Sequence, residues 1–337
     1  MIDETVLHPV GDNPPKARLI YGADVIEGLA MLADHSVNTI CTSPPYFGLR
    51  DYEGNEAQIG FGVDLDGYIE SLVEVFRAAK RVLRKDGTLW LNLGDSYASN
   101  PASGGPSEWG MAQNTPKAKY KRPEGLKPKD LIGVPWRVAL ALQADGWYLR
   151  SEIIWHKSNP MPESVKDRPT KGHEHVFLLS HPDGGGKYYY DIEAIKEPSI
   201  TPDTVVRGSG GVLGQLNSGK RGDAVEDYSG TSRNKRDVWT VTLEPYYGAH
   251  FACWPQKLVE PMVLAGCPKG GTVLDTFSGS ATTGLVALKK GRNYVGIDLN
   301  ESYLPLARCR ISGTKLGRPK SIAPEVSTLD VFGVTSD

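Results

Sequence analysis

A hydroxyl, two prolines and an aromatic ring follow one apolar segment of this chain at close spacing. Val37–Cys41 has the composition of a buried strand, and Thr42-Ser43-Pro44-Pro45-Tyr46-Phe47 comes directly after it. Because proline has no N–H, this turn offers carbonyl acceptors and almost no donors. A serine hydroxyl, a proline carbonyl and an aromatic face side by side suit a planar ring that carries an amino group.

A second distinctive segment, Gly271–Gly284, lies more than 200 residues further along the chain. Its pattern predicts a strand ending at Asp275, a loop of small residues and a helix. Gly279 permits a tight turn and the close approach of a ligand, and the N-terminus of the helix attracts a carboxylate or phosphate. Asp298 ends the next apolar strand, 23 residues after Asp275, where an acidic side chain can accept both hydroxyls of a ribose. The segment therefore predicts a nucleotide-type cofactor site.

The type of cofactor has more than one interpretation. Gly279-x-Ala281-x-x-Gly284 imitates a dinucleotide fingerprint, so a nicotinamide or flavin cofactor has to be weighed. An aspartate that ends the first strand, with Phe277 two residues later, fits S-adenosylmethionine better. A turn that joins strand and helix without binding any ligand is the third interpretation.

The two segments together resemble the DNA amino-methyltransferases, a family that modifies exocyclic nitrogens of bases. The catalytic signature of the family is Asp, Asn or Ser followed by Pro-Pro and Tyr or Phe, and this chain has Ser43-Pro44-Pro45-Tyr46. The cofactor signature resembles Asp275–Ser280 with Asp298 downstream. Because the catalytic motif precedes the cofactor motif, the order resembles the circularly permuted β class. The likeness covers roughly residues 18–190 and 238–312.

The resemblance implies roles for individual positions. The residues expected at the catalytic turn are Ser43, Pro44, Pro45 and Tyr46. The residues expected to bind S-adenosylmethionine, the methyl-donating co-substrate, are Asp24, Thr42, Asp275, Phe277, Gly279, Ser280 and Asp298. No metal is expected. Ala281 stands where the family usually has a second glycine, a mild departure that still accommodates the ligand.

The reaction implied is methyl transfer from S-adenosylmethionine to the exocyclic amine of a base flipped out of double-stranded DNA. Acceptance of two N–H bonds by the Ser43 hydroxyl and the Pro44 carbonyl would localise the lone pair of the nitrogen, and Tyr46 offers a stacking face. No cysteine lies in the catalytic motif, which argues against methylation at carbon 5. Serine before Pro-Pro is commoner among the cytosine N4 enzymes of the family, so cytosine N4 is favoured over adenine N6.

Three competing functions remain to be separated from this one. The same cofactor could serve an enzyme that acts on RNA or on a protein amide. A nucleic-acid-binding subunit without catalysis is opposed by the intact catalytic and cofactor motifs. An oxidoreductase that uses a nicotinamide cofactor leaves the Pro-Pro turn unexplained.

Strands and helices alternate along the chain, which predicts an α/β protein with a mostly parallel sheet. The resemblance implies a Rossmann-like S-adenosylmethionine-dependent methyltransferase fold with seven strands and helices on both faces. The expected strands are 18–21, 37–42, 88–93, 147–156, 173–180, 272–275 and 294–297, with 187–191 as an edge strand or hairpin arm. The expected helices are 25–32, 65–83, 134–144, 255–265, 281–289 and 303–311.

The expected organisation is one methyltransferase domain interrupted by an insert. Residues 1–190 form its catalytic half, with a structureless Gly/Pro/Lys-rich loop at 98–130, and residues 238–312 form its cofactor half. Residues 191–237 form the target-recognition insert, because a long polar segment inside a compact domain is functional or disordered. Residues 313–337 form a flexible tail.

Composition narrows the partners. The net charge of −2 does not draw the whole molecule to polyanions, so DNA contact must come from local clusters. The basic clusters are 117–129 and 207–236. With no signal-peptide pattern, no membrane-length apolar stretch and no CxxC pair, the expectation is a cytoplasmic protein of a bacterium or of a phage in its host. The resemblance adds a homodimer and a cognate restriction endonuclease as partners to test.

His173-Glu174-His175 could suggest a metal site. Alternation along a strand would put both histidines on one face, but no third ligand is in view and the spacing fits no zinc signature. The favoured interpretation is that these are strand residues with structural hydrogen bonds.

Overall fold

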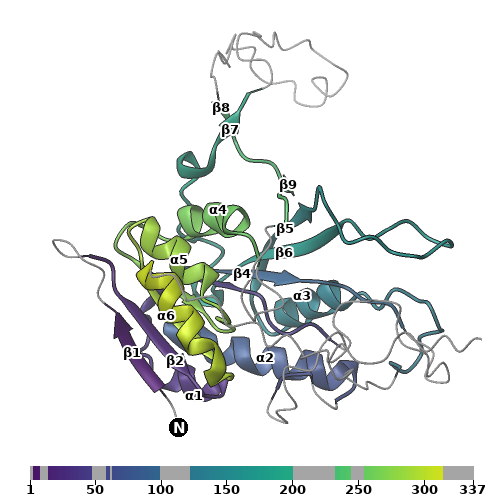
Figure 1. The fold of residues 1–337 in the computed structure, drawn as a ribbon, viewed down its shortest axis with the longest axis horizontal. Helices are drawn as coiled ribbons and strands as arrows, with labels where there is room; N and C mark the ends of the chain where they lie inside the picture. The colour runs from purple at the N-terminus through teal and green to yellow at the C-terminus, as the bar shows by residue number, and fades with distance from the viewer. Residues whose placement is uncertain are drawn as a thin grey trace, which may run out of the picture.

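The computed structural model describes residues 3–7, 14–47, 58–60, 63–98, 122–199, 232–243 and 254–313. Within these ranges nine strands form one sheet in the order β1-β2-β11-β10-β3-β4-β6-β5-β9 (Figure 1). Their bounds are β1 Asp3–Leu7, β2 Ala17–Tyr21, β3 Val37–Thr42, β4 Leu83–Leu93, β5 Tyr148–His156, β6 His173–Ser180, β9 Val238–Thr240, β10 Thr272–Asp275 and β11 Asn293–Asp298.

Strand direction decides where the chemistry can gather. The strands β2, β11, β10, β3 and β4 run parallel, and β6 pairs antiparallel with both β4 and β5. The expected α/β methyltransferase sheet is confirmed, with β1 and β9 added at its two edges. The carboxyl ends of β3, β4, β10 and β11 meet at one edge of the sheet, which is where ligands bind in open α/β folds.

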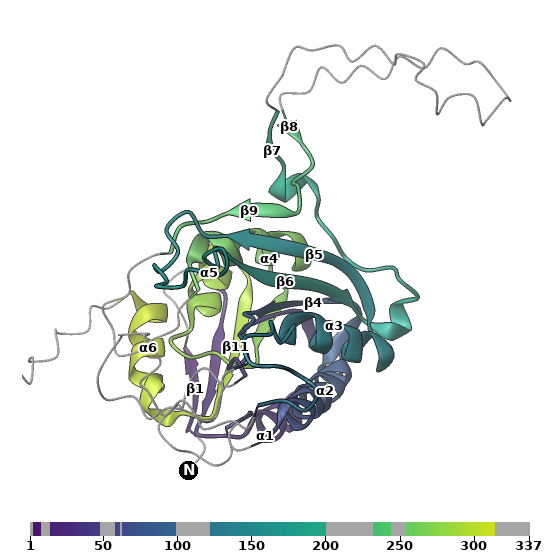
Figure 2. The same ribbon diagram turned by 90° about the vertical axis from the view of Figure 1, so that its right-hand side faces the viewer.

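Six α-helices in the described ranges cover the two faces of the sheet (Figure 2). The helices α1 Val25–Ala30, α2 Leu65–Val82 and α3 Val134–Ala144 contribute to the apolar core on one face. The helices α4 Gln256–Gly266, α5 Thr282–Lys289 and α6 Leu304–Ser312 contribute to the core on the other. None of these described helices is both long and apolar enough to cross a membrane.

Local signals explain where the helices on the first face begin. The carboxylate of Asp64 accepts the Gly67 N–H at 2.9 Å and caps α2. The helix α3 begins after Gly133. Its φ of 76° lies in the left-handed region, which glycine adopts easily because it has no side chain. Asp95, just beyond β4, accepts the N–H groups of Gly133 and Val134 at 3.0 Å each. The end of β4 therefore supplies the cap of α3.

Most expected elements agree with the structure to within a few residues, and strands 37–42, 173–180 and 272–275 agree at both ends. The expectation of a strand or hairpin arm at 187–191 was wrong. There the Tyr189 N–H donates to the Asp86 carbonyl at 2.8 Å, and the Asp191 N–H donates to the Ala265 carbonyl at 2.9 Å. The carbonyl groups of β4 and α4 accept hydrogen bonds from this backbone, which therefore pairs with no strand.

Two long polar segments interrupt the alternation of strands and helices. Backbone hydrogen bonds join the two ends of each segment where it leaves the domain. The Ala98 N–H donates to the Asp130 carbonyl at 2.8 Å, which closes the base of the 98–130 loop. The strands β7 Glu197–Pro198 and β8 Ser232–Arg233 pair antiparallel and form a stem that stands away from the main sheet (Figure 1). Residues 99–121, 200–231 and 314–337 lie outside the described residues. The recognition insert, the flexible tail and the division into halves therefore stay predictions.

Candidate active site

A hydrogen bond joins the two motifs that the sequence separates. Thr42 ends β3 and Asp275 ends the neighbouring β10, and the Thr42 hydroxyl donates to Asp275 Oδ1 at 2.7 Å. The Thr276 hydroxyl donates to Thr42 Oγ1 at 3.1 Å. The Ser43–Tyr46 turn therefore starts directly beside the loop that follows Asp275.

Asp275 is a buried carboxylate, 2% exposed. Burial raises its pKa to about 6, although hydrogen bonds from Thr283 at 2.6 Å, from Thr42 and from the Phe277 N–H oppose the shift. It forms no ion pair with any described residue. Among the described residues, no cation neutralises this negative group.

Asp298 ends β11, the strand next to β10, and lies at the same edge of the sheet as Asp275. It accepts the Gly279 N–H at 2.6 Å and the Asn300 N–H at 2.9 Å, and burial raises its pKa to about 6. Two such carboxylates, with no ion-pair partner among the described residues, suit a ligand that brings positive charge and hydroxyl donors. S-adenosylmethionine, with a sulfonium, an ammonium and a ribose, has this composition, so the donor set fits it.

A cluster of hydroxyls under the cofactor loop was not predicted from the sequence. The Tyr21 hydroxyl donates to the Gly279 carbonyl at 2.7 Å, and Ser278 Oγ lies 2.7 Å from both Tyr21 and Tyr294. Gly296 leaves the space, since a Cβ there would lie 2.6 Å from Ser278 Oγ. These contacts hold the loop on β2 and β11. Tyrosines in apolar strands carry no sequence signal for this role.

The remaining expected cofactor residues occupy the same edge. Asp24 caps α1 through the Ile26 N–H at 2.8 Å, and it lies just after β2, the neighbour of β11. Phe277 is partly buried against the core. The Ser280 hydroxyl accepts Arg310 Nη1 at 2.7 Å, a contact within the protein.

The unusual Ala281 has a conformational explanation. It adopts φ 58° at the N-cap of α5, in the left-handed region that glycine enters most easily. The position where the family usually has a second glycine is thus one where the backbone has a left-handed turn.

Contacts with the core hold the catalytic turn in place. The Tyr68 hydroxyl donates to the Pro45 carbonyl at 2.8 Å, and Phe47 packs on Tyr68 in the core with ring centroids 5.4 Å apart. No described residue donates to the Pro44 carbonyl. That carbonyl is the acceptor that the sequence assigned to the amine of a base.

Two polar side chains, which the sequence analysis did not assign to the site, contact the turn. Asn92 near the end of β4 lies with Nδ2 at 3.2 Å from Ser43 Oγ and 2.7 Å from the Tyr46 hydroxyl. The Tyr46 hydroxyl donates to Glu174 Oε2 at 2.6 Å, and Asn92 Nδ2 lies 3.1 Å from the same oxygen. Ser43, Tyr46, Asn92 and Glu174 therefore form one network.

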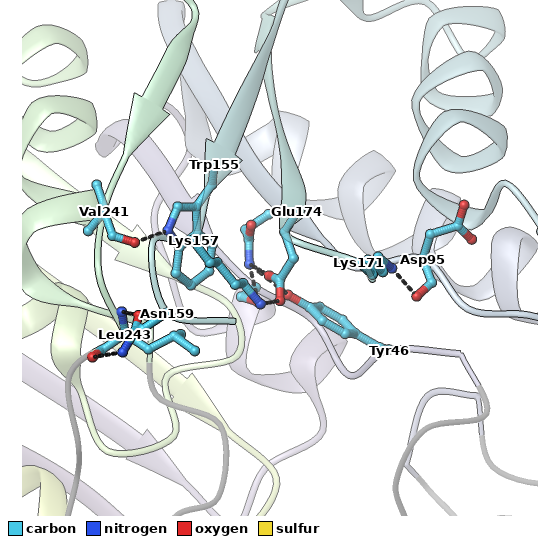
Figure 3. Close-up of polar contacts among 11 residues, drawn as sticks. Tyr46, Asp95, Trp155, Lys157, Asn159, Lys171, Glu174, Val241 and Leu243 are labelled. Carbon is cyan, nitrogen blue, oxygen red and sulfur yellow. Dashed lines mark hydrogen bonds and ion pairs between the residues drawn. The ribbon is translucent and has the colours of Figure 1, made fainter. Parts of the chain in front are cut away.

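A lysine completes this network (Figure 3). Lys157 forms an ion pair with Glu174, and its ammonium lies 4.8 Å from the centroid of the Trp155 ring. Burial alone would raise the pKa of Glu174. The charge of Lys157, together with hydrogen bonds from Lys157, Tyr46 and Asn92, holds that pKa below its usual value. Glu174 is therefore an ionised carboxylate next to the catalytic turn.

Alternation along β6 was interpreted correctly for the histidines and incompletely for Glu174. His175 Nδ1 lies 2.6 Å from Glu152, a structural contact, and His173 is its ring neighbour. Glu174 points to the opposite face and reaches Tyr46. In the described part of the chain no group of three or more metal-ligating side chains comes together.

The basic clusters are partly neutralised where the structure describes them. Lys129 pairs with Asp167 at 2.6 Å, and Arg233 and Arg236 both bind Glu197. The rest of both clusters lies largely outside the described residues. Their contact with phosphate stays a prediction.

Comparison with known proteins places the chain in a family. Residues 37–308 match the family model for N6 and N4 methyltransferases described as DNA methylase. The chain is 46% identical to Type II methyltransferase M.SmaI of Serratia marcescens, over 89% of this chain and 92% of that protein. It is 45% identical to M.Cfr9I of Citrobacter freundii, over 87% of each. The chain belongs to the DNA methylase family, and the expected enzyme class, a DNA amino-methyltransferase, is confirmed.

Solved structures agree in fold. The fold is similar to that of PvuII DNA methyltransferase (cytosine-N4-specific), with a TM-score of 0.59 and 17% identity over 90% of this chain and 88% of that one. It is also similar to a putative DNA modification methylase of Thermus thermophilus complexed with S-adenosyl-L-methionine. There the TM-score is 0.54 and the identity 21%, over 88% of this chain and 93% of that one.

Proposed function

We propose that this enzyme transfers the methyl group of S-adenosylmethionine to N4 of a cytosine that has been flipped out of double-stranded DNA at a specific sequence. The observation that carries the proposal is the 2.7 Å hydrogen bond between Thr42 and Asp275. Because of it, acceptors for an amine lie beside a pocket whose carboxylates suit a cationic, ribose-containing ligand. Methyl transfer between the two ligands would explain why acceptors for an amine and carboxylates for a cationic ligand lie side by side.

Each group in the site has a proposed task. S-adenosylmethionine supplies, when bound, a methyl group activated on a sulfonium. Asp298 would accept the ribose hydroxyls, and Asp275 would keep the cofactor loop in place and provide negative charge nearby. Ser43 Oγ and the Pro44 carbonyl would accept the two N–H bonds of the amine and so localise its lone pair, while the ring of Tyr46 would stack on the flipped base.

The preference for cytosine rests on Ser43. Serine at the first position of the signature is commoner among cytosine N4 enzymes, and aspartate among adenine N6 enzymes. The PvuII enzyme is cytosine-N4-specific by name, but at 17% identity its likeness concerns the fold. Adenine N6 is the alternative, since both bases present the same kind of amine.

The wider context belongs to the same proposal. The relatives above are named Type II methyltransferases, which supports a cognate restriction endonuclease and a cytoplasmic location in a bacterium or infected cell. Residues 191–237 would read the sequence, and the basic loop would clamp phosphates. Replacement of Lys121 and Arg122 by alanine should weaken binding to all DNA sequences and flatten its salt dependence. A homodimer stays a prediction.

The test is to identify the product. The protein is incubated with labelled S-adenosylmethionine and mixed-sequence DNA, and the DNA is digested to nucleosides and analysed by mass. N4-methylcytosine is expected. N6-methyladenine would overturn the choice of base, and label in RNA or peptide amides but not in DNA would overturn the substrate class. Ser43→Ala, which keeps the cofactor pocket, should lower kcat about 100-fold or more, with cofactor affinity unchanged in a binding titration.

A further inference from the structure

The ion pair between Glu174 and Lys157 lies next to Tyr46, and no step proposed above uses either residue (Figure 3). We infer that Glu174, held by Lys157, is the positioning residue that fixes the Tyr46 ring and the Asn92 amide in the geometry needed to receive the flipped base. The inference rests on the proposed function and adds residues to it that neither motif contains.

The backbone brings these side chains to one face of the sheet. Glu174 pairs with Trp155 across β6 and β5, so Lys157, two residues beyond Trp155, points to the same face as Glu174. Asn92 occupies that face on β4, on the other side of β6. Trp155 is itself anchored, since its indole N–H donates to the Val241 carbonyl at 2.9 Å. Three neighbouring strands thus position Asn92, Glu174 and Lys157 on one face.

The hydrogen bonds require a charged acceptor at the centre. Glu174 Oε2 accepts the Tyr46 hydroxyl at 2.6 Å and lies 3.1 Å from Asn92 Nδ2, while Oε1 accepts Lys157. All the contacts come from donors, so an ionised carboxylate can satisfy them together and a neutral carboxyl, which carries its own O–H, cannot. With its nitrogen drawn to Glu174, Asn92 also donates toward Ser43. One carboxylate therefore orients both ends of the catalytic turn.

Among the described residues, two lysines and one tyrosine hydroxyl face the Glu174 carboxylate. Lys157 follows β5 and Lys171 precedes β6, and the Tyr46 hydroxyl faces the carboxylate from the catalytic turn. The histidines of β6 lie on the opposite face. Without Lys157, burial would be opposed mainly by the hydrogen bonds and by Lys171, so the pKa of Glu174 would rise.

A double-mutant cycle tests whether Glu174 acts through the Tyr46 hydroxyl. Glu174→Gln and Tyr46→Phe are each expected to lower the rate constant of methyl transfer, measured in a single turnover, about 10-fold. The dissociation constant of S-adenosylmethionine should be unchanged. The double variant should be about as active as the slower single variant, because both changes break the same contact. Multiplied effects, about 100-fold together, would overturn the inference.

Glu152→Gln is the matched control. Glu152 contacts His175 on the other face of the same two strands, and a glutamine can keep that hydrogen bond. Its kcat should equal that of the wild type, and its combination with Tyr46→Phe should match Tyr46→Phe alone. A loss as large as that of Glu174→Gln would mean that any change in these strands slows the enzyme, which contradicts a specific role.

A pH profile gives a second readout that a structural ion pair would not move. Lys157→Met should make kcat fall on acidification at a pH where the wild type stays active, because Glu174 then takes up a proton. The variant with both Lys157→Met and Glu174→Gln should lack this limb. A Lys157→Met profile that superimposes on the wild type overturns the inference, and this profile decides alone should Glu174→Gln fail to fold. A wild type that methylates no DNA contradicts the proposed function instead.

Discussion

At the scale of single residues, Asp275 and Asp298 are carboxylates whose burial lowers the stability of the folded protein. The pKa of each is raised to about 6 from an ordinary value of 3.8, chiefly because burial disfavours the charged form. At neutral pH both are ionised with no ion-pair partner in the described part of the chain. A cationic ligand, as proposed above, would offset this cost.

The sign of the resulting pH dependence follows from linkage. Between pH 3.8 and about 6 the folded protein holds protons on these carboxyls that the unfolded chain has lost. The free energy of unfolding that they contribute therefore falls as pH rises through this range and stays low above it. The histidines His173 and His181, whose pKa values burial lowers, act in the opposite direction.

Asp298→Asn isolates the effect, because the histidines are common to both proteins. Relative to this variant, the wild type should lose about 1–2 kcal/mol of unfolding free energy between pH 5 and pH 7.5. Urea unfolding of both proteins without ligand at the two pH values measures the difference. A difference that is constant with pH, or that grows as pH rises, would contradict a raised pKa at Asp298.

At the scale of elements, strand ends do two jobs in this protein. The β4 strand delivers Asn92 to the catalytic turn, and three residues later Asp95 caps α3 through the N–H groups of Gly133 and Val134. The backbone of Asp95 also accepts the Lys171 ammonium. The site edge and the first face of helices are thus tied together at one point.

Asp95→Ala should lower the free energy of unfolding by about 2 kcal/mol, because it leaves buried N–H groups of α3 without an acceptor. Asp95→Asn, which keeps one acceptor oxygen, should lose about half as much. Urea unfolding measures both. Asp64→Ala is a comparison at a cap that accepts one N–H, and an equal loss there would show that the extra contacts of Asp95 add nothing.

At the scale of the whole molecule, the stem formed by β7 and β8 separates the segment proposed to read DNA from the main sheet. Its two short strands pair antiparallel, and Arg233 and Arg236 bind Glu197 at its base. The ends of the segment between them are therefore close enough to be joined by a tight turn. The nine described strands of the main sheet all lie outside that segment.

Replacement of residues 201–231 by Asn-Gly should leave the domain folded and its affinity for S-adenosylmethionine unchanged. Selectivity among DNA sequences should be lost, and the remaining binding should be weak and strongly salt-dependent. Calorimetric titration of the cofactor and competition between DNA sequences measure the two properties. Retained selectivity would place recognition elsewhere, with the 98–130 loop as the next segment to delete.

Local sequence was enough for most elements and for both motifs. The apolar runs ending at Thr42 and Asp275, with prolines or glycine directly after them, predict strands followed by site-forming turns, because a residue's backbone preferences are local. The same reasoning failed at 187–191, where a run of tyrosines suggests a strand but distant carbonyls satisfy the backbone.

What the tertiary structure alone decided is which side chains meet. The Thr42–Asp275 contact spans 233 residues and the Tyr46–Glu174 contact spans 128, and no spacing along the chain encodes either. Sheet order and register set both, because they place Glu174 and Asn92 on one face of neighbouring strands, and β3, which leads into the Ser43–Tyr46 turn, next to both β4 and β10. The sequence by itself predicted an amine-accepting turn and a cofactor loop, and strand pairing decided that a partly buried glutamate, paired with a lysine, contacts the turn.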